Sequence, residues 1–428
     1  MRTLYSLVFL ALLPFVILRL FLKGRHLKGY RERILERFGI YSAPLRRGPK
    51  IWIHAVSVGE CEAAFPLIRR LARSHPDLGI VMTCTTATGS SRIKAVLGKQ
   101  VDHVYLPYDV PLFVNRFLDY VEPTLGVIME TEIWPNLFVL AGKRDIPLVI
   151  ANGRLSDKSV KGYTRLTRLI HPALSAIRLV AAQSQSDADR YVELGMNPDS
   201  VQNMGNIKFD IAWETVQRND SDALKARLFQ RRPVLVAGST HPGEEEMVLD
   251  AYGLIKKSFR DLTLVLVPRH PERGAECLAL CTSRGFVSHL LSERESFNES
   301  DEILVIDRVG ELRRYYGASE VAYIGGSLVP HGGQNPLEPL VAGIPVIFGP
   351  YMMNFREIRD LVLKSDAGFQ VDSPETLAEQ VQCLLQDSHR RRAMGERGEK
   401  MIITNQGALE RLTSALEPWL ASSQHIHP

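Results

Sequence analysis

The chain has 428 residues, of which 45% are hydrophobic and 23% charged, and its formal net charge is +4. This length predicts two domains of about 200 residues each, and the composition excludes collagen-like, mucin-like and low-complexity proteins. The mild positive charge gives no support for nucleic acid as a partner.

The N-terminal segment from Leu4 to Leu22 is long and apolar enough to cross a membrane, and its one charge, Arg19, lies near its end. Six basic residues follow within 23–37, so the positive-inside rule predicts a cytoplasmic body. A cleaved signal peptide would carry its charge in front and a cleavage site behind, and neither is present. We therefore expect a membrane anchor. Pro14 and the marginal length leave a shallow, interfacial helix open, and in either case the basic segment can bind anionic headgroups.

Short apolar runs alternate with amphipathic stretches through the rest of the chain, which is typical of βαβ units and parallel sheets. A charged, weakly patterned stretch at 213–232 interrupts the alternation. We therefore predict an anchor at 1–22, a Rossmann-like domain at 23–212, a linker at 213–232 and a second Rossmann-like domain at 233–421. In such a doubly wound fold the active site lies at the carboxyl ends of the strands, in a cleft between the domains. The predicted strands lie within 51–57, 79–86, 103–108, 125–130, 147–153, 179–184, 233–240, 263–269, 302–307, 321–326 and 344–349.

Several cofactor and metal signals are absent or weak. No G-x-G-x-x-G follows the first strand of either domain and no P-loop motif occurs, which disfavours nicotinamide enzymes and P-loop ATPases. Asp187 and Asp189 form an Asp-x-Asp that could hold a metal, but after Ser184 they fit helix capping better. Cys277 and Cys281 fit a helix core, because no second ligand pair accompanies them. Five cysteines without a C-x-x-C pair indicate reduced thiols in a cytosolic compartment.

The apolar runs end in "HAVSVGE", "ETEIWPN", "NGRLSDKS", "GNIKFD", "AGSTHPGEEE", "PRHPER" and "GGQNPLEP". Together these ordered motifs resemble the 3-deoxy-D-manno-octulosonic acid (Kdo) transferases over essentially the whole chain. The resemblance implies a GT-B glycosyltransferase that moves Kdo from CMP-Kdo to the lipid A precursor (lipid IVA) in lipopolysaccharide synthesis. It also implies the cytoplasmic face of the inner membrane, inversion at the anomeric carbon, and neither a metal nor a cofactor.

Glu60 is the expected proton acceptor, because attack by an acceptor hydroxyl needs a base nearby. Ser57 and Gly59 give the tight turn that presents it. The alternative for Glu60 is a helix-dipole or capping role in the first helical turn.

The donor carries a phosphodiester and a sugar carboxylate, which fixed cations can balance. The resemblance places Lys208 in transition-state stabilisation and Pro268 with Arg269 at CMP, whereas surface solvation is the alternative for both cations. Glu130 matches a position thought to stabilise the transition state, but it could instead hold Lys208 by charge pairing.

"GGQNPLEP" is predicted to be a glycine-rich loop feeding a helix, with Pro336 near its first position and backbone donors aimed at an anion. The resemblance extends the CMP contacts to Val309, Gly310, Glu311, Asn335, Pro336, Leu337 and Glu338. Secondary candidates, each with a structural alternative, are His54, Arg154, Ser239, His241 and His331. Two other functions stay open: a GT-B enzyme with another nucleotide sugar and lipid acceptor, or a non-catalytic membrane-anchored nucleotide-binding protein.

Overall fold

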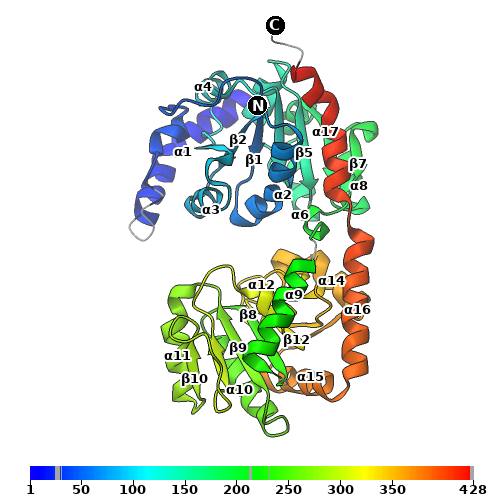
Figure 1. Cartoon of the computed structure of the whole chain (residues 1–428). Helices are drawn as coiled ribbons and strands as arrows, with labels where there is room; N and C mark the ends of the chain where they lie inside the picture. The colour runs from blue at the N-terminus through cyan, green and yellow to red at the C-terminus, as the bar shows by residue number, and fades with distance from the viewer. Residues whose placement is uncertain (25–28, 30, 212–214, 231, 425–428) are drawn as a thin grey trace. The chain divides into compact units, whose positions relative to one another are not determined.

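The computed structural model describes residues 1–24, 29, 31–211, 215–230 and 232–424, and it divides into two compact units (Figure 1). Unit 1 comprises Met1–Asp210 and Gln406–Pro428, and unit 2 comprises Ile211–Asn405. The predicted domain boundary at residue 212 and part of the basic segment after Leu22 lie outside the described residues. Each unit contains a parallel sheet with helices on both faces, as in the predicted doubly wound fold.

Unit 1 has a seven-stranded sheet in the order β3-β2-β1-β4-β5-β6-β7. Its strands are β1 (Lys50–His54), β2 (Gly79–Cys84), β3 (Asp102–Tyr105), β4 (Leu125–Met129), β5 (Leu148–Gly153), β6 (Ile177–Ala182) and β7 (Val201–Asn203). Its helices are α1 (Arg2–Lys23), α2 (Val58–Ser74), α3 (Ala87–Leu97), α4 (Pro111–Val121), α5 (Pro135–Gly142), α6 (Asp157–Thr164), α7 (Thr167–Leu174), α8 (Gln185–Glu193) and α17 (Ala408–Gln424).

The strands of unit 1 are apolar on both faces because both faces are covered. Ile51 and Ile53 pack into one core cluster with residues of α2 and α17, whereas Trp52 between them packs into a second cluster with residues of α4, α5 and α8. Alternating side chains of one strand thus enter two cores, which explains why these strands are continuous apolar runs in the sequence.

Unit 2 repeats this architecture with the strand order β10-β11-β9-β8-β12-β13-β14. Its strands are β8 (Val234–Thr240), β9 (Thr263–Pro268), β10 (Ser288–Leu290), β11 (Ile303–Val305), β12 (Val321–Ile324), β13 (Val346–Phe348) and β14 (Gly368–Gln370). Its helices are α9 (Thr215–Leu224), α10 (Glu245–Lys256), α11 (Gly274–Ser283), α12 (Leu312–Gly317), α13 (Leu337–Leu340), α14 (Arg356–Lys364), α15 (Pro374–Gln386) and α16 (Ser388–Asn405). The strands predicted from the sequence are confirmed, and three short edge strands, β7, β10 and β14, were not predicted.

The predicted linker at 213–232 is wrong for its described part, which is helical. Helix α9 continues into a π-helical turn at Lys225–Phe229, and both belong to unit 2. Leu224, Leu228 and Phe229 are at most 4% exposed. Their i, i+4, i+5 spacing places them on one face of the helix, which packs towards α12 (Figure 1).

The predicted end of the second domain at residue 421 also needs correction. The chain returns to unit 1 at Gln406, and α17 packs against α2 there (Figure 1). Leu412, Leu416 and Leu420 of α17 are buried in a core cluster of unit 1. Asp210 caps the start of this helix, because its carboxylate accepts hydrogen bonds from the backbone N–H groups of Gly407 (2.6 Å) and Leu409 (2.7 Å).

Helix α1 is the one described segment that is long and apolar enough to cross a membrane, judged by length and composition over Arg2–Leu22. It belongs to unit 1, and Leu13 and Ser6 are each 8% exposed. A side of this helix is therefore covered by the protein itself.

Because α17 packs in unit 1, a smaller side chain on the buried face of α17 should destabilise unit 1. Leu416→Ala, at a position with 0% exposure, should cost about 2–5 kcal/mol of unit 1 stability through lost burial and the cavity left behind. Hydrogen exchange followed by mass spectrometry should show faster exchange in α2 and β1, with β8 and β9 unchanged. Ile403→Ala in α16, at a 61% exposed position, is the matched control and should change exchange little. Faster exchange in β8 and β9 instead would contradict the assignment of α17 to unit 1.

Candidate functional site

The chain order of the unit 1 sheet reverses between β1 and β4. Strands β2 and β3 lie on one side of this point and β5 to β7 on the other. In open parallel sheets, ligands bind at such a switch point, outside the carboxyl ends of the strands. Glu60 follows β1, and Glu130 follows β4 directly. The sheet therefore brings two of the three predicted catalytic residues to one place.

Glu60 fastens the turn between β1 and α2. Its carboxylate accepts hydrogen bonds from the Val56 N–H (2.8 Å) and the Ser57 hydroxyl (2.9 Å), and Ser57 Oγ accepts one from the Glu60 N–H (3.3 Å). The capping interpretation thus describes a real contact. Each carboxylate oxygen still has a second lone pair that can receive a proton. Burial raises the pKa of Glu60, and the nearby Glu130 charge raises it further, so this side chain is a stronger base than an exposed carboxylate.

Glu130 and Lys208 form an ion pair beside this turn. Lys208 Nζ lies 3.4 Å from Glu130 Oε1, and the two side chains are 22% and 18% exposed. The pairing considered from the sequence is therefore present. Glu130 has a φ of 58°, a left-handed conformation that is rare for a residue with a side chain. Such conformations cluster at functional sites because the surrounding structure must hold them in place.

A buried amide network holds Lys208 where it can reach Glu130. Asn152 Oδ1 accepts from the Ile207 N–H (3.0 Å), and its backbone carbonyl accepts from Gln183 Nε2 (2.9 Å). Asn206 Nδ2 donates to Gln183 Oε1 (3.0 Å), and Asn206 Oδ1 accepts from the Lys208 N–H (3.0 Å). All three amide residues are at most 5% exposed. The network fixes the backbone of the short turn that carries Lys208.

Glu132 is a third carboxylate of this group, and the sequence argument did not single it out. Burial raises its pKa to about 7, with further contributions from the charges of Glu60 and Glu130. The signal was available, since the "ETEIWPN" motif has a second acidic residue two positions after Glu130. A carboxyl group with this pKa exchanges a proton near neutral pH.

The unit 2 sheet reverses its order between β8 and β12. Glu244 lies at this point, is fully buried, and was also missed from the sequence. Its carboxylate accepts hydrogen bonds from the Tyr323 hydroxyl (2.6 Å) and from the N–H groups of Gly326 (2.7 Å), Ser327 (3.0 Å) and Leu328 (3.0 Å). Gly326 has a φ of 67°, which glycine adopts without a steric cost. One carboxylate thus shapes the glycine-rich loop after β12.

Histidine rings and Arg269 lie at the same switch point. The rings of His241 and His331 stack with 4.2 Å between centroids, and Gln334 Nε2 lies 3.2 Å from His241 Nε2. Burial lowers the pKa of His241 to about 4, and the charges of His331, His270 and Arg269 lower it further. His241 is therefore neutral at neutral pH, and Arg269 is an exposed, permanent cation near it.

The structure places the other predicted CMP residues on loops that follow strands of unit 2. Pro268 ends β9, Val309 is 77% exposed, and Gly310 has a φ of 89°. Glu311 lies 3.1 Å from Arg314 in an ion pair at the start of α12. These residues lie at the carboxyl edge of the unit 2 sheet.

The "NPLE" segment differs in detail from its prediction. Helix α13 has four residues and begins at Leu337, so Pro336 precedes the helix. The Leu337 N–H already donates to Asn335 Oδ1 (3.1 Å), and Asn335 Nδ2 lies 3.4 Å from Glu338 Oε1. The helix is too short for a strong dipole, so recognition of an anion here would depend mainly on side chains and loop backbone.

Three of the secondary candidates, His54, Arg154 and Ser239, lie in surroundings that fit a structural role. His54 is fully buried with Nδ1 2.9 Å from Thr83 Oγ1, and burial lowers its pKa to about 3. The carbonyl of Arg154 accepts a hydrogen bond from the Thr131 hydroxyl. Ser239 has a φ of 58° at the end of β8. His54 is therefore a neutral core residue, because protonation would bury a charge.

The capping interpretation of Asp187 is confirmed. Its carboxylate accepts from the Ser184 hydroxyl (2.6 Å) and the Leu155 N–H (2.9 Å), and its own N–H donates to Ser184 Oγ (3.1 Å). Asp189 accepts from Gln185 Nε2 (2.9 Å). Among the described residues, no group of three or more acidic, histidine or cysteine side chains is arranged to hold a metal ion.

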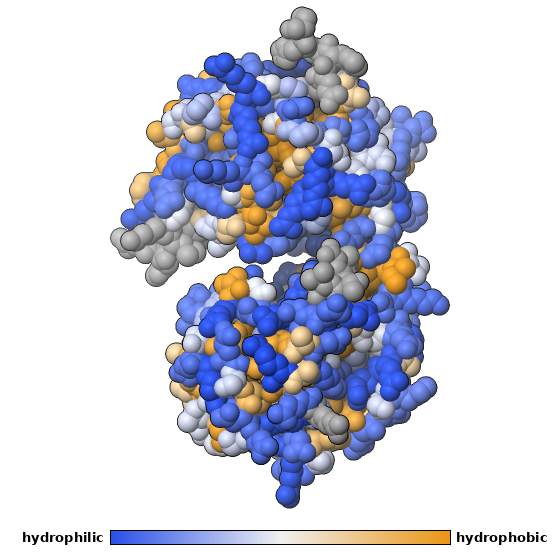
Figure 2. Space-filling model, viewed as in Figure 1, coloured by the Kyte–Doolittle hydropathy of each residue, from blue (hydrophilic) through white to orange (hydrophobic). Residues whose placement is uncertain are grey.

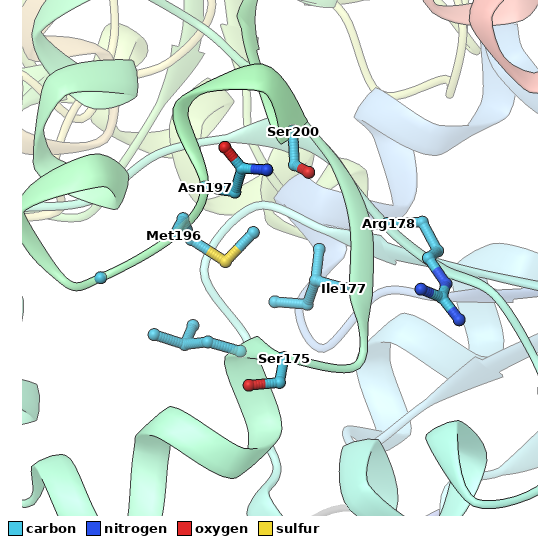
Figure 3. Close-up of a pocket in the computed structure, with 8 residues that line it drawn as sticks. Ser175, Ile177, Arg178, Met196, Asn197 and Ser200 are labelled. Atoms are coloured by element: carbon cyan, nitrogen blue, oxygen red, sulfur yellow. The ribbon is translucent and has the colours of Figure 1, made fainter.

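A shallow pocket of about 280 Å³ lies elsewhere in unit 1 (Figure 3). Ile177 and Arg178 at the amino end of β6 line it, together with Ser175, Asn197 and Ser200. It is therefore at the opposite edge of the sheet from Glu60 and Glu130, and we do not assign it to the site.

Solved structures agree with the fold. A glycosyltransferase from Rickettsia africae matches 89% of this chain and 100% of its own with a TM-score of 0.55 at 13% identity. A UDP-GlcNAc 2-epimerase from Neisseria meningitidis matches 86% of this chain and 100% of its own with a TM-score of 0.57 at 14% identity. At this identity the likeness concerns the fold alone, which is the predicted GT-B architecture of two doubly wound units.

Sequence comparison identifies the family. Residues 32–211 match the family model of 3-deoxy-D-manno-octulosonic-acid transferases, and residues 244–401 match that of glycosyl transferases group 1. The 3-deoxy-D-manno-octulosonic acid transferase of Haemophilus influenzae is 40% identical over 91% of this chain and 92% of its own length. The same enzyme from Bordetella pertussis is 33% identical over 98% of this chain and 99% of its own. With the predicted motifs at the carboxyl ends of both sheets, these matches show that the chain belongs to the family of Kdo transferases.

Proposed function

We propose that the chain transfers Kdo from CMP-Kdo to the lipid A precursor lipid IVA, at the cytoplasmic face of the inner membrane. The observation that carries the proposed chemistry is the group formed by Glu60, Glu130 and Lys208 at the switch point of unit 1. Family membership supports Kdo as the transferred sugar. The exposed apolar side chains of α1 support attachment to a membrane.

In the proposed reaction, Glu60 removes the proton from the acceptor hydroxyl as its oxygen bonds to the anomeric carbon of Kdo. The bond from that carbon to the CMP phosphate oxygen breaks, and its electron pair leaves with CMP. A single displacement inverts the anomeric carbon. Glu60 must be ionised to act as a base. Its raised pKa makes it more basic, and it moves the acid limb of the pH–rate profile to a higher pH than an ordinary carboxyl group would give.

Cations balance the charges that the reaction creates. In this proposal Arg269, on a loop of unit 2, binds the phosphate of CMP, and Lys208 stabilises charge in the transition state. Glu130 orients Lys208 through their 3.4 Å ion pair. The proposed CMP contacts from Val309 to Glu311 and from Asn335 to Glu338 complete the donor site. We propose that fixed cations suffice and that neither a metal nor a cofactor takes part.

Incubation of the full chain with CMP-Kdo and lipid IVA should give a lipid product heavier by Kdo, detected by mass spectrometry. Activity should continue in EDTA, because the proposed charge balance uses side chains only. UDP-sugars in place of CMP-Kdo are the control and should give no product. Absence of product from CMP-Kdo would refute the proposed function, and restoration of activity only by Mg²⁺ would refute its metal independence.

Glu60→Gln should lower kcat by about 100-fold or more, because the amide keeps the size of the side chain but cannot take a proton. CMP affinity and melting temperature should change little, since the amide can still bond to Val56 and Ser57. Glu62→Gln, on the same helix but 44% exposed and paired with Arg92, is the matched control. Near-normal kcat in Glu60→Gln would leave only the capping role for this residue.

Arg269→Ala should weaken CMP binding by about 1.5–3 kcal/mol, the usual worth of a hydrogen bond to a charged group. Isothermal titration with CMP measures this loss directly. Arg284→Ala removes an exposed cation elsewhere in unit 2 and should leave the affinity unchanged. If both variants bind CMP as the parent chain does, Arg269 is not part of the donor site.

A further inference from the structure

Helix α1 is two-sided along its length. Tyr5, Ser6, Phe9 and Leu13 lie on the side that faces the body of unit 1, with the spacing of one helix face. The opposite side presents a row of large apolar side chains to the outside. Figure 2 shows apolar surface where Figure 1 draws α1. The exposed apolar residues, each between 41% and 70% exposed, are Leu4, Leu7, Val8, Leu10, Leu12, Phe15, Leu18, Phe21 and Leu22.

Polar contacts fasten the N-terminal end of α1 to buried groups of unit 1. Asn136 Nδ2 donates to Ser6 Oγ (3.0 Å), and the Tyr5 hydroxyl lies close enough to the Asp109 carboxylate for its charge to help raise the pKa of Tyr5, after burial as the main cause. Asp109 and Asn136 are 1% and 0% exposed. The Asp109 carboxylate also accepts from the N–H groups of Asn136 (3.0 Å) and Leu137 (2.8 Å) at the start of α5. The N-terminal end of α1 is thus attached to the interior of unit 1.

Aromatic packing continues this attachment along the helix. The ring centroid of Phe9 lies 6.0 Å from that of Tyr108, and Tyr108 contacts Phe38 at 5.8 Å. Leu13 is 8% exposed one turn further on. Contacts between α1 and the body therefore extend over several turns and are not confined to the end where the chain enters unit 1.

These contacts are incompatible with α1 crossing a bilayer. From Ser6 to Lys23 the helix rises about 25 Å, close to the thickness of the hydrocarbon core. In a spanning helix, Tyr5 and Ser6 would lie at the face of the bilayer opposite the body, beyond reach of Asp109 and Asn136. A folded unit with polar surface cannot accompany the helix through hydrocarbon.

We propose that α1 is an in-plane anchor that remains docked on unit 1 and inserts its exposed apolar row into a single leaflet. This inference rests on the proposed membrane attachment and specifies its geometry. The occupant of the apolar row is the acyl-chain region of an anionic bilayer. Arg19 and Arg31 are exposed near one end of the row, where their charges complement anionic headgroups.

Docking also connects the membrane to the catalytic group. Asp109 lies near Tyr5 of α1 and binds the first turn of α5, and α5 begins five residues after Glu130. The leaflet surface is therefore held in a fixed relation to Glu130 and its neighbours. A lipid acceptor whose acyl chains stay in that leaflet would present its sugar hydroxyl at a constant height.

A spanning helix and an in-plane helix place residue 3 on opposite sides of the bilayer. Cysteine labelling can measure this difference. Thr3→Cys is made in the full chain with Cys383→Ser, which removes the one described cysteine that is not buried. Glu193→Cys in the same background reports the side on which the body lies, because Glu193 is exposed on α8. A membrane-impermeant maleimide is applied to sealed inverted and to sealed right-side-out inner-membrane vesicles. We expect Glu193→Cys to react in inverted vesicles and neither cysteine to react in right-side-out vesicles.

Reaction of Thr3→Cys in right-side-out vesicles, where Glu193→Cys does not react, would overturn the in-plane anchor. Loss of the chain from the vesicles on flotation would instead refute the membrane attachment itself. Reaction of Glu193→Cys in right-side-out vesicles would refute the proposed side of the membrane. The three failures are therefore distinguishable.

A second variant tests the docking contacts without shortening the helix. Tyr5→Phe combined with Ser6→Ala removes both hydroxyl groups and keeps the apolar row. We expect unchanged flotation with the vesicles and about tenfold faster hydrogen exchange at the start of α5. Thr3→Ser is the matched control, because it changes a neighbouring hydroxyl residue while retaining the hydroxyl. Unchanged exchange in the double variant would contradict docking, since a spanning helix has no contact there to lose.

Discussion

Buried carboxylates that bind backbone N–H groups hold the functional loops of both units. Where a helix or loop begins, several N–H groups have no partner within secondary structure, and an acidic side chain can satisfy them. Glu244 binds three such groups after β12, and Asp109 binds two at the start of α5. Asp210 binds two at the start of α17, and Glu60 binds one before α2. The positions of the site residues depend on these contacts.

This constraint explains why Glu60 could be interpreted in two ways. A carboxylate that fastens its own turn is held in one orientation, which a general base also requires. The price of that orientation is partial use of its acceptor capacity by Val56 and Ser57. Burial and the neighbouring Glu130 charge act in the opposite direction, because they raise the affinity of Glu60 for a proton. Capping and catalysis are therefore compatible in one side chain.

The sequence predicted what local patterns determine. Short, nearly continuous apolar runs identified the central strands, because both faces of each sheet are buried. Edge strands such as β7, whose sequence is Val-Gln-Asn, contain polar residues and lack such a run. Helix α9 was hidden by its many charges, although Leu224 and Leu228 already had helical spacing. The return of α17 to unit 1 depends on core contacts with residues more than 300 positions away, which local patterns do not encode.

The same distinction holds for the site. Glu60, Glu130, Lys208 and Arg269 stand in recognisable motifs at strand ends, and the structure brings the first three together. Glu244 and Asp109 were not predicted, since their partners are up to 84 and 28 positions away in the chain. The ion pair between Lys208 and Glu130 spans 78 positions, so only the fold could establish it.

The two switch points also differ in charge, and this difference fits the chemistry proposed for each. Three carboxylates and one lysine gather in unit 1, where burial and, to a smaller degree, mutual repulsion favour proton uptake, as the pKa of about 7 for Glu132 illustrates. In unit 2, Arg269 lies beside histidine rings, and its charge helps to keep His241 neutral. The positive charge in unit 2 attracts an anionic nucleotide sugar, and the carboxylates in unit 1 repel it. The environment in unit 1 suits an acceptor hydroxyl that must lose its proton. A base there is neither neutralised by a strong cation nor exposed to solvent. The distribution of charge thus supports the proposed acceptor activation in unit 1 and the proposed donor binding in unit 2.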